Sequence, residues 1–126
     1  MEELIMQELG EEGIGRIVAG FYRRVPGDDL MGPMYPEDDL EGAEERLRDF
    51  LLFRLAGKRD YLAKRGHPRL RMRHMPFSIG KAERDRWLML MGASMDEAGV
   101  QGESREWLDA FFAHVADFMR NREETT

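Results

Sequence analysis

Apolar residues recur at helical spacing in four stretches of this 126-residue chain, and this periodicity restricts the fold more than any other feature. The stretches cover about residues 14–25, 38–56, 81–98 and 104–119. The last one places large apolar side chains on a single wide stripe: Trp107, Leu108, Phe111, Phe112, Val115, Phe118 and Met119. No stretch combines strict alternation with a tight turn, as a β-hairpin would. The sequence therefore predicts an all-α protein.

Residues at the ends of these stretches indicate where each helix begins and ends. Asp38, followed three residues later by Glu41, predicts a capping box at the start of the second helix. Ser104 is the predicted N-cap of the last helix. Gly57 and Gly99 are expected to end the second and third helices, because glycine readily adopts the left-handed conformation that closes a helix.

The length suits one domain over residues 1–126, with a short N-terminal segment at 1–10 and a polar tail at 121–126. Apolar residues in the N-terminal segment predict a short helix before the first long one. A chain of this size can bury a substantial core without disulfides or structural metals.

The composition excludes several functional classes. The chain has no cysteine, so a disulfide, a thiolate metal site and a thiol nucleophile are all excluded. A net charge of −6 argues against nucleic acid as the main partner. The longest uncharged run, residues 87–95, is too short to span a membrane, and residues 1–5 lack the features of a secretory signal. We therefore expect a cytoplasmic protein with no membrane or nucleic-acid partner.

The basic stretch at residues 65–77 contains two of the three histidines, His67 and His74. A short helix that opens near Pro68 should end at about His74, because the residue before Pro76 is disfavoured in the helical region. An imidazole at that helix end can bind a metal through one ring nitrogen while the other nitrogen donates to a carbonyl. The alternative is a solvated surface histidine among arginines.

Tyr22 and Trp87 lie on the apolar faces of two predicted helices. A buried donor without an acceptor costs about 1–3 kcal/mol, so each side chain needs a polar partner. A backbone carbonyl is the common partner, and a polar ligand inside an apolar pocket is the other. Pro33 and Pro36 predict a corner that carries a third aromatic residue, Tyr35.

Seven segments of the chain match one family pattern in order and spacing: Phe21 with Tyr22, residues 35–40, 42–48, 65–74, Pro76 with Phe77, residues 83–85, and Trp87. Together they resemble the truncated haemoglobins of group II, the subfamily with a tryptophan in the distal pocket. The resemblance implies a two-over-two helical sandwich enclosing one haem b, an iron protoporphyrin IX. The chain departs from the family pattern in two places. Glu12 and Gly13 replace a glycine pair found in many members, and Gly57 is followed by Lys58 where a second glycine is usual.

The resemblance also implies roles for individual residues. By match, His74 resembles the proximal iron ligand, and Tyr22 and Trp87 resemble the distal residues that donate hydrogen bonds to dioxygen. Tyr35 resembles the aromatic corner residue that packs on the haem edge. The remaining implied haem contacts are Phe21, Ala43, Arg46, Leu47, Tyr61, Arg73 and Phe77, with the arginines and Tyr61 near the propionates. The other histidines, His67 and His114, are not expected to bind iron.

The function implied by the resemblance is binding of dioxygen, carbon monoxide and nitric oxide at a five-coordinate iron. Two distal donors imply tight holding of dioxygen, and they also suit nitric oxide dioxygenation or peroxide chemistry, with electrons from an unidentified reductase. The expected assembly is a monomer or a weak homodimer. Two alternatives stay open: a dedicated haem peroxidase, and a haem-free helical module that binds partner helices through a methionine-rich face.

Overall fold

The computed structural model describes residues 1–35, 37–57 and 79–120. These residues form four α-helices: α1 (Glu2–Arg24), α2 (Leu40–Ala56), α5 (Lys81–Glu97) and α6 (Gly102–Phe118). Two short 3-10 helices, η1 (Gly32–Met34) and η2 (Glu37–Asp39), lie between α1 and α2. The described residues contain no β-strand, and the predicted all-α class is confirmed.

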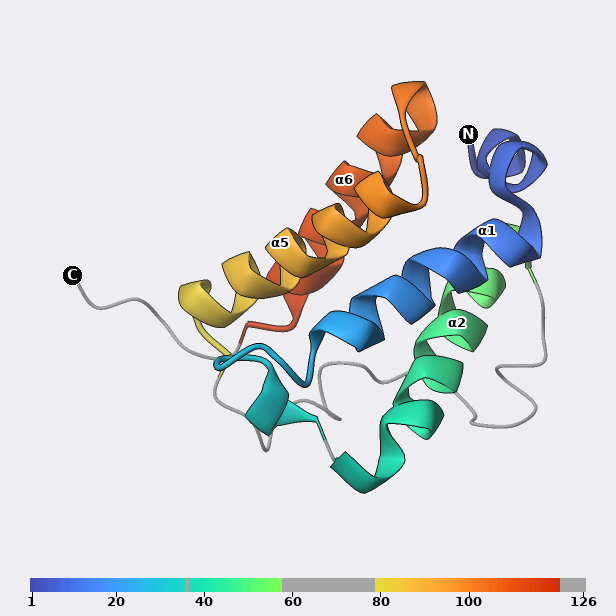
Figure 1. The fold of residues 1–126 in the computed structure, drawn as a ribbon. Coiled ribbons are helices and arrows are strands. Elements are labelled where there is room, and N and C mark those ends of the chain that lie inside the picture. The colour runs from blue at the N-terminus through green and yellow to red at the C-terminus, as the bar shows by residue number, and fades with distance from the viewer. Residues whose placement is uncertain (36, 58–78, 121–126) are drawn as a thin grey trace.

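Helix α1 lies between the other helices of the described fold. It packs against α2 on one side and against α5 on the other, and α5 in turn packs against α6 (Figure 1). The apolar face predicted for residues 14–25 is buried along its whole length: Ile14, Ile17, Val18, Phe21, Tyr22 and Val25. Leu51 of α2, Met91 and Met95 of α5 and Leu108 of α6 complete the same core. The core therefore centres on α1.

Helix α1 is interrupted at Gly10, whose φ of 66° and ψ of −179° lie outside the helical region. Glycine adopts such a conformation without steric cost, because it has no Cβ. The predicted short N-terminal helix is thus confirmed as the first part of α1. Ile5 in this part is fully buried, and Glu8 accepts a 2.7 Å hydrogen bond from the Ser104 hydroxyl of α6.

Two predicted helix caps are wrong. The N-cap residue of α6 is Gln101, and Ser104 is buried in the first turn with its hydroxyl bonded to the N-terminal part of α1. The N-cap residue of α2 is Asp39, and no side chain caps this helix, because residues 37–39 already form η2. The Asp39 carboxylate pairs with Arg46 at 3.2 Å.

Both predicted glycine stops are confirmed. Gly57 and Gly99 have φ angles of 68° and 76°, in the left-handed region that glycine favours. After α5, the Gly99 N–H donates to the Asp96 carbonyl at 3.1 Å and the Val100 N–H donates to the Met95 carbonyl at 3.0 Å. These two bonds define a Schellman motif. The resulting turn allows α6 to pack back against α5.

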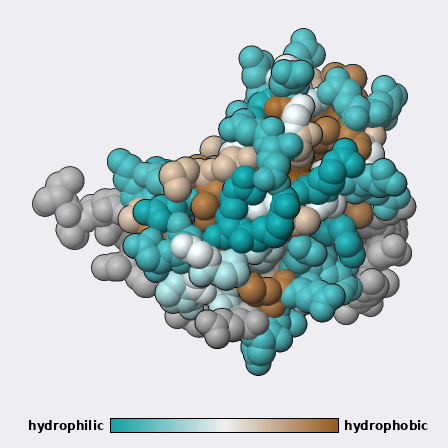
Figure 2. Space-filling view, in the orientation of Figure 1, coloured by the Kyte–Doolittle hydropathy of each residue, from teal (hydrophilic) through white to brown (hydrophobic). Residues whose placement is uncertain are grey.

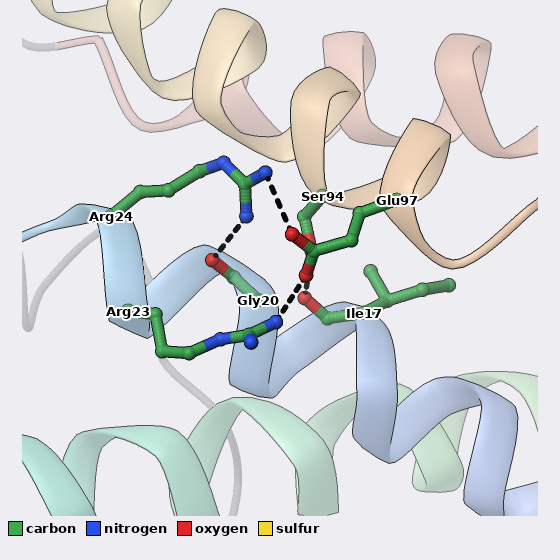
Figure 3. A network of polar contacts seen from close by, with 6 residues as sticks. All are labelled: Ile17, Gly20, Arg23, Arg24, Ser94 and Glu97. Carbon is green, nitrogen blue, oxygen red and sulfur yellow. Dashed lines mark hydrogen bonds and ion pairs between the residues drawn. The ribbon is translucent and has the colours of Figure 1, made fainter.

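Glycine and serine allow α1 and α5 to approach closely (Figure 3). The buried Ser94 hydroxyl of α5 donates to the Ile17 carbonyl of α1. A Cβ atom at Gly20 would overlap the Ser94 hydroxyl oxygen. Both arginines at the end of α1 pair with Glu97, and one of them, Arg24, also donates to the Gly20 carbonyl at 2.9 Å. These contacts fix α5 against the central helix.

The surface of the described fold is mainly hydrophilic on the face shown in Figure 2. Three large apolar side chains among the described residues are nevertheless exposed: Met1 by 47%, Met89 by 58% and Phe118 by 53%. The predicted apolar stripe of the last helix is therefore wrong at Phe118, which is the final residue of α6. Among the described helices, none combines the length and the apolarity that crossing a bilayer requires.

Candidate functional site

Three side chains with hydrogen-bond donors converge beside the last turn of α1. Tyr22 belongs to α1, Tyr35 follows η1 directly, and Trp87 lies near the start of α5. The tyrosine rings are perpendicular, with centroids 5.5 Å apart. The centroid of the Phe21 ring lies 5.1 Å from that of Tyr22 and 5.4 Å from that of Trp87. The structure thus brings together Tyr22 and Trp87, which the resemblance assigned as distal donors, and Tyr35, which it assigned to the haem edge.

Local structure explains how each side chain reaches this point. Tyr22 lies on the buried face of α1 and is 9% exposed. Tyr35 follows η1 in an extended conformation (φ −121°, ψ 140°), with its N–H donating to the Gly32 carbonyl at 3.2 Å. Trp87 is partly buried and packs against Phe112 of α6, with centroids 5.6 Å apart. The site therefore requires α1, η1, α5 and α6 together.

Burial controls the ionisation of both tyrosines. Removal from water raises the pKa of Tyr22 above its usual value of 10.0, and the neighbouring Tyr35 adds to this effect while the Arg46 charge opposes it. Removal from water also raises the pKa of Tyr35, to about 12, although hydrogen bonds from Trp87 and Tyr22 to its hydroxyl oxygen act against this rise. Both hydroxyls therefore keep their protons at neutral pH and remain hydrogen-bond donors.

Helix α2 contributes apolar side chains and two charged residues, Arg46 and Glu44, which shift the pKa of Tyr22 in opposite directions. Ala43 and Phe50 are buried, and Leu47 is partly buried in the same core. Arg46 lies on the exposed side, where its guanidinium pairs with Asp39 at 3.2 Å and its side chain is 37% exposed. The same core therefore holds the tyrosine pair and the apolar face of α2, and the Arg46 charge acts on Tyr22.

A comparison with known proteins places this arrangement in a family. The family model of the bacterial-like globins matches residues 6–121. The chain belongs to this globin family. The Group 2 truncated hemoglobin YjbI of Bacillus subtilis (strain 168) is 38% identical over 94% of this chain and 89% of its own length. The predicted resemblance to group II truncated haemoglobins is therefore confirmed.

Solved structures show the same fold. A hemoglobin from the thermophilic phototrophic bacterium Chloroflexus aurantiacus is 45% identical, with a TM-score of 0.87 over 94% of this chain and 98% of that one. A truncated oxygen-avid haemoglobin from Bacillus subtilis is 37% identical, with a TM-score of 0.87 over 93% of this chain and 98% of that one. The two-over-two globin fold predicted from the sequence is confirmed, and the protein is a haem-based binder of diatomic gases.

The described residues of this globin fit a haem group. Buried apolar side chains of α1 and α2 suit the faces of a flat macrocycle, and Tyr22 and Trp87 both interact with the Tyr35 hydroxyl. A polar ligand of the iron can accept hydrogen bonds from the same donors. The site thus combines an apolar enclosure with donors directed at one position.

Several predicted site residues lie outside the described residues. They are the proximal candidate His74 and the haem contacts Tyr61, Arg73 and Phe77. Within residues 1–35, 37–57 and 79–120, no cluster of three or more His, Cys, Asp or Glu side chains could hold a metal ion. His114 of α6 is exposed in this globin.

Sequence reasoning missed two features of the site. Phe112 was assigned only to the apolar stripe of the last helix, yet it packs directly on Trp87. Asp28 was assigned only to a turn after the first helix, yet its carboxylate pairs with Arg86, the neighbour of Trp87, at 2.6 Å. The turn sequence indicated a carboxylate at that place but not its partner, which is 58 residues away.

Proposed function

We propose that this globin carries haem b, that His74 is the protein ligand of a five-coordinate iron, and that the site holds dioxygen tightly. The observation that carries the proposal is the convergence of Tyr22, Tyr35 and Trp87 around Phe21. A plain helical core needs no such cluster, because every buried donor requires an acceptor. Tyr35 offers a single hydroxyl oxygen to these donors, and a polar ligand among the same side chains would supply a further acceptor.

When bound, haem supplies a ferrous iron that takes a diatomic gas and shifts negative charge onto dioxygen. The Tyr22 hydroxyl and the Trp87 indole N–H would donate to this charge, with Tyr35 beside both donors. Hydrogen bonds to charged acceptors are stronger than neutral ones, and donors already oriented in apolar surroundings need little reorganisation. We therefore expect slow dioxygen release and slow autoxidation. The oxygen-avid character of the Bacillus subtilis neighbour supports this expectation.

Other residues complete the proposed haem site. The apolar walls come from Phe21, Ala43, Leu47 and Phe77. The partners of the haem propionates are Arg46, Arg73 and Tyr61. Because Arg46 already pairs with Asp39, a propionate would share this guanidinium with the Asp39 carboxylate.

Absorption spectra of the purified protein, with and without reductant and carbon monoxide, test the haem site. We expect a Soret band, a five-coordinate ferrous spectrum and a carbon monoxide complex, followed by slow dioxygen dissociation in stopped-flow displacement. A colourless protein that is stable and helical without haem would contradict the proposal and indicate a helical interaction module.

The same donors also suit two further reactions, and each of them can be tested separately. One is the reaction of dioxygen with nitric oxide to give nitrate, and the other is reduction of hydrogen peroxide to water, with electrons from a reductase. Nitric oxide consumption that depends on dioxygen would support the first. Peroxide turnover far above that of ordinary globins, together with fast dioxygen release, would identify a dedicated peroxidase and overturn the proposed tight holding.

The iron ligand is tested by His74→Gly. We expect the variant to lose haem, or to bind it only when imidazole is added, because the substitution removes the proposed protein ligand. His67→Gly is the matched control, since it removes a histidine from the same basic stretch. A wild-type Soret band and carbon monoxide complex in His74→Gly would show that another residue binds the iron.

A further inference from the structure

The carboxylate of Asp28 organises the turn between α1 and the segment that carries Tyr35. Its side chain is only 9% exposed. One carboxylate oxygen accepts hydrogen bonds from the Leu30 N–H at 3.1 Å and from the Met31 N–H at 2.7 Å. The Asp28 carbonyl accepts a third bond, from the Gly32 N–H at 2.9 Å. The start of η1, and with it the approach to Tyr35, is therefore built around this one residue.

The second carboxylate oxygen of Asp28 faces α5. It accepts a 2.6 Å hydrogen bond from the guanidinium of Arg86, which also reaches Asp29 at 3.2 Å. Partial burial alone would raise the pKa of Asp28, but the bonds from the Met31 N–H and from Arg86 lower it below the usual 3.8. The pair is therefore fully charged at neutral pH. It links the turn before Tyr35 to the helix that carries Trp87.

Arg86 directly precedes Trp87, and successive residues of an α-helix point about 100° apart around the axis. Holding Arg86 at the turn therefore sets the rotation of the first turns of α5, and this rotation sets the direction of the indole. Other ion pairs of α5 differ in burial. Arg84 of the same helix pairs with Asp117, whose side chain is 58% exposed. Exposed pairs of this kind usually contribute little to stability.

We propose that the Asp28–Arg86 pair is a positioning device for the distal donors, which holds the Trp87 indole N–H toward the ligand position beside Tyr35. This role rests on the proposed function, in which Trp87 donates to the dioxygen ligand. Neither Asp28 nor Arg86 needs to touch the ligand. Their effect passes through the backbone of η1 and through the orientation of α5.

The test uses the haem-bound protein and compares Arg86→Met, Arg86→Lys and Arg84→Met. Methionine keeps much of the side-chain length but removes the guanidinium, and lysine restores the charge. Arg84→Met is the matched control, because it removes an arginine of the same helix whose partners are the exposed Asp85 and Asp117. We expect Arg86→Met to release dioxygen about threefold to tenfold faster, corresponding to a partly lost hydrogen bond. Arg86→Lys should recover part of this effect, and Arg84→Met should match wild type.

A spectroscopic readout reports on the indole without measuring ligand release. The chain has two tryptophans, so Trp107→Phe assigns the two indole N–H signals in the nuclear magnetic resonance spectrum of the carbon monoxide complex. We expect the Trp87 signal to shift in Arg86→Met while the Trp107 signal stays in place. Asp28→Asn is a second variant that keeps an oxygen acceptor for the turn and loses the charge pair, so it should shift the same signal.

Combining Arg86→Met with Trp87→Phe separates this proposal from the proposed function. If the pair acts through the indole, Arg86→Met adds no further acceleration of dioxygen release once the indole N–H is absent. An unmoved Trp87 signal in both Arg86→Met and Asp28→Asn, or an equal acceleration in the Trp87→Phe background, would overturn the positioning role. A wild-type dioxygen off-rate in Trp87→Phe alone would instead overturn the proposed function.

Discussion

In the proposed site, individual donor hydrogens determine how a polar ligand would be held. Tyr22 and Trp87 come from helices that contact each other, and both interact with the hydroxyl of Tyr35. A ligand that carries negative charge competes with that oxygen for the same donors. The hydroxyl of Tyr35 can then turn its own proton toward the ligand or toward a neighbour. The strength of holding is therefore a property of three side chains acting together.

Loss of the indole N–H should weaken the holding of dioxygen. Hydrogen bonds to charged groups contribute roughly 1.5–3 kcal/mol. At 1.4 kcal/mol per factor of ten, Trp87→Phe should release dioxygen about ten- to a hundredfold faster than wild type. Tyr22→Phe should have a smaller effect, because Trp87 and Tyr35 can reorient toward the ligand. Stopped-flow displacement on both single variants and on the double variant measures this.

Carbon monoxide provides the internal control for the same variants. It carries less negative charge when bound, so its release should respond more weakly to both substitutions. A dioxygen off-rate in Trp87→Phe that equals the wild-type value would show that the indole does not hold the ligand.

The tyrosine hydroxyls should resist ionisation in alkaline solution. The raised pKa values mean that the folded state keeps these protons more tightly than the unfolded chain, whose tyrosines ionise near pH 10. The associated stability is thus complete below pH 10 and declines as the pH rises above it. Carbon-13 signals of the ring carbons that bear the hydroxyls follow ionisation. We expect the Tyr35 signal to move only near pH 12, and the Tyr22 signal to move later.

Tyr22→Phe and Tyr35→Phe assign the two signals, since each variant lacks one of them. A midpoint near pH 10 for both residues would mean that water reaches their hydroxyls, and the dry donor pair described here would be wrong.

Among the helices, the close contact between α1 and α5 is the one most sensitive to side-chain size. Gly20 leaves room for the Ser94 hydroxyl, which bonds to the Ile17 carbonyl in the buried interface. The same two helices carry Tyr22 and Trp87. We therefore expect their separation at Gly20 to affect the distance across the proposed ligand site, because interiors are close-packed and transmit small displacements.

Gly20→Ala should destabilise the protein. The added Cβ overlaps the Ser94 hydroxyl oxygen, and overpacking of this kind typically costs 1–3 kcal/mol, of which up to about 1 kcal/mol is offset by the better helix propensity of alanine. Gly15→Ala in the same helix is the matched control, because its new Cβ would lie 4.0 Å from the Arg48 side chain, at ordinary contact distance. Denaturant unfolding of the haem-bound variants measures the difference.

Removal of the serine hydroxyl should relieve the overlap. Gly20→Ala combined with Ser94→Ala is thus expected to be more stable than Gly20→Ala alone. If Gly20→Ala and Gly15→Ala are equally stable, the close approach of α1 and α5 at this point is not tight.

The globin as a whole should depend on its haem for part of its stability. A group that binds only the folded state raises the free energy of unfolding by mass action. Removal of haem should therefore lower the melting temperature, and addition of haem to the stripped protein should restore it. Circular dichroism at rising temperature compares the two forms. Identical melting curves would mean that haem binds the unfolded chain as well as the folded one, or that it does not bind.

Helix content and the main buried face could be predicted from the sequence because both depend on local spacing. The apolar residues between Ile14 and Val25 recur as helix turns recur, and their face is buried whichever partner covers it. Gly57 and Gly99 are similarly local, since the left-handed turn needs only glycine. The aromatic donors Tyr22 and Trp87 were recognised because they match the family motif. Their position on apolar helix faces also required an explanation, since a buried polar aromatic needs a hydrogen-bond partner.

Tertiary structure alone decided which distant groups meet. Ser104 has the side chain of a cap, but its hydroxyl bonds to Glu8, 96 residues away in sequence. Phe118 belongs to the predicted apolar stripe, but it is 53% exposed, whereas the next residue, Met119, is buried. The sequence assigned no role to Arg86, and only the fold shows that it pairs with Asp28. Spacing along the chain specifies the direction of a side chain on its own helix, whereas the partner depends on how the helices cross, and helix crossing is set by the packing of the whole core.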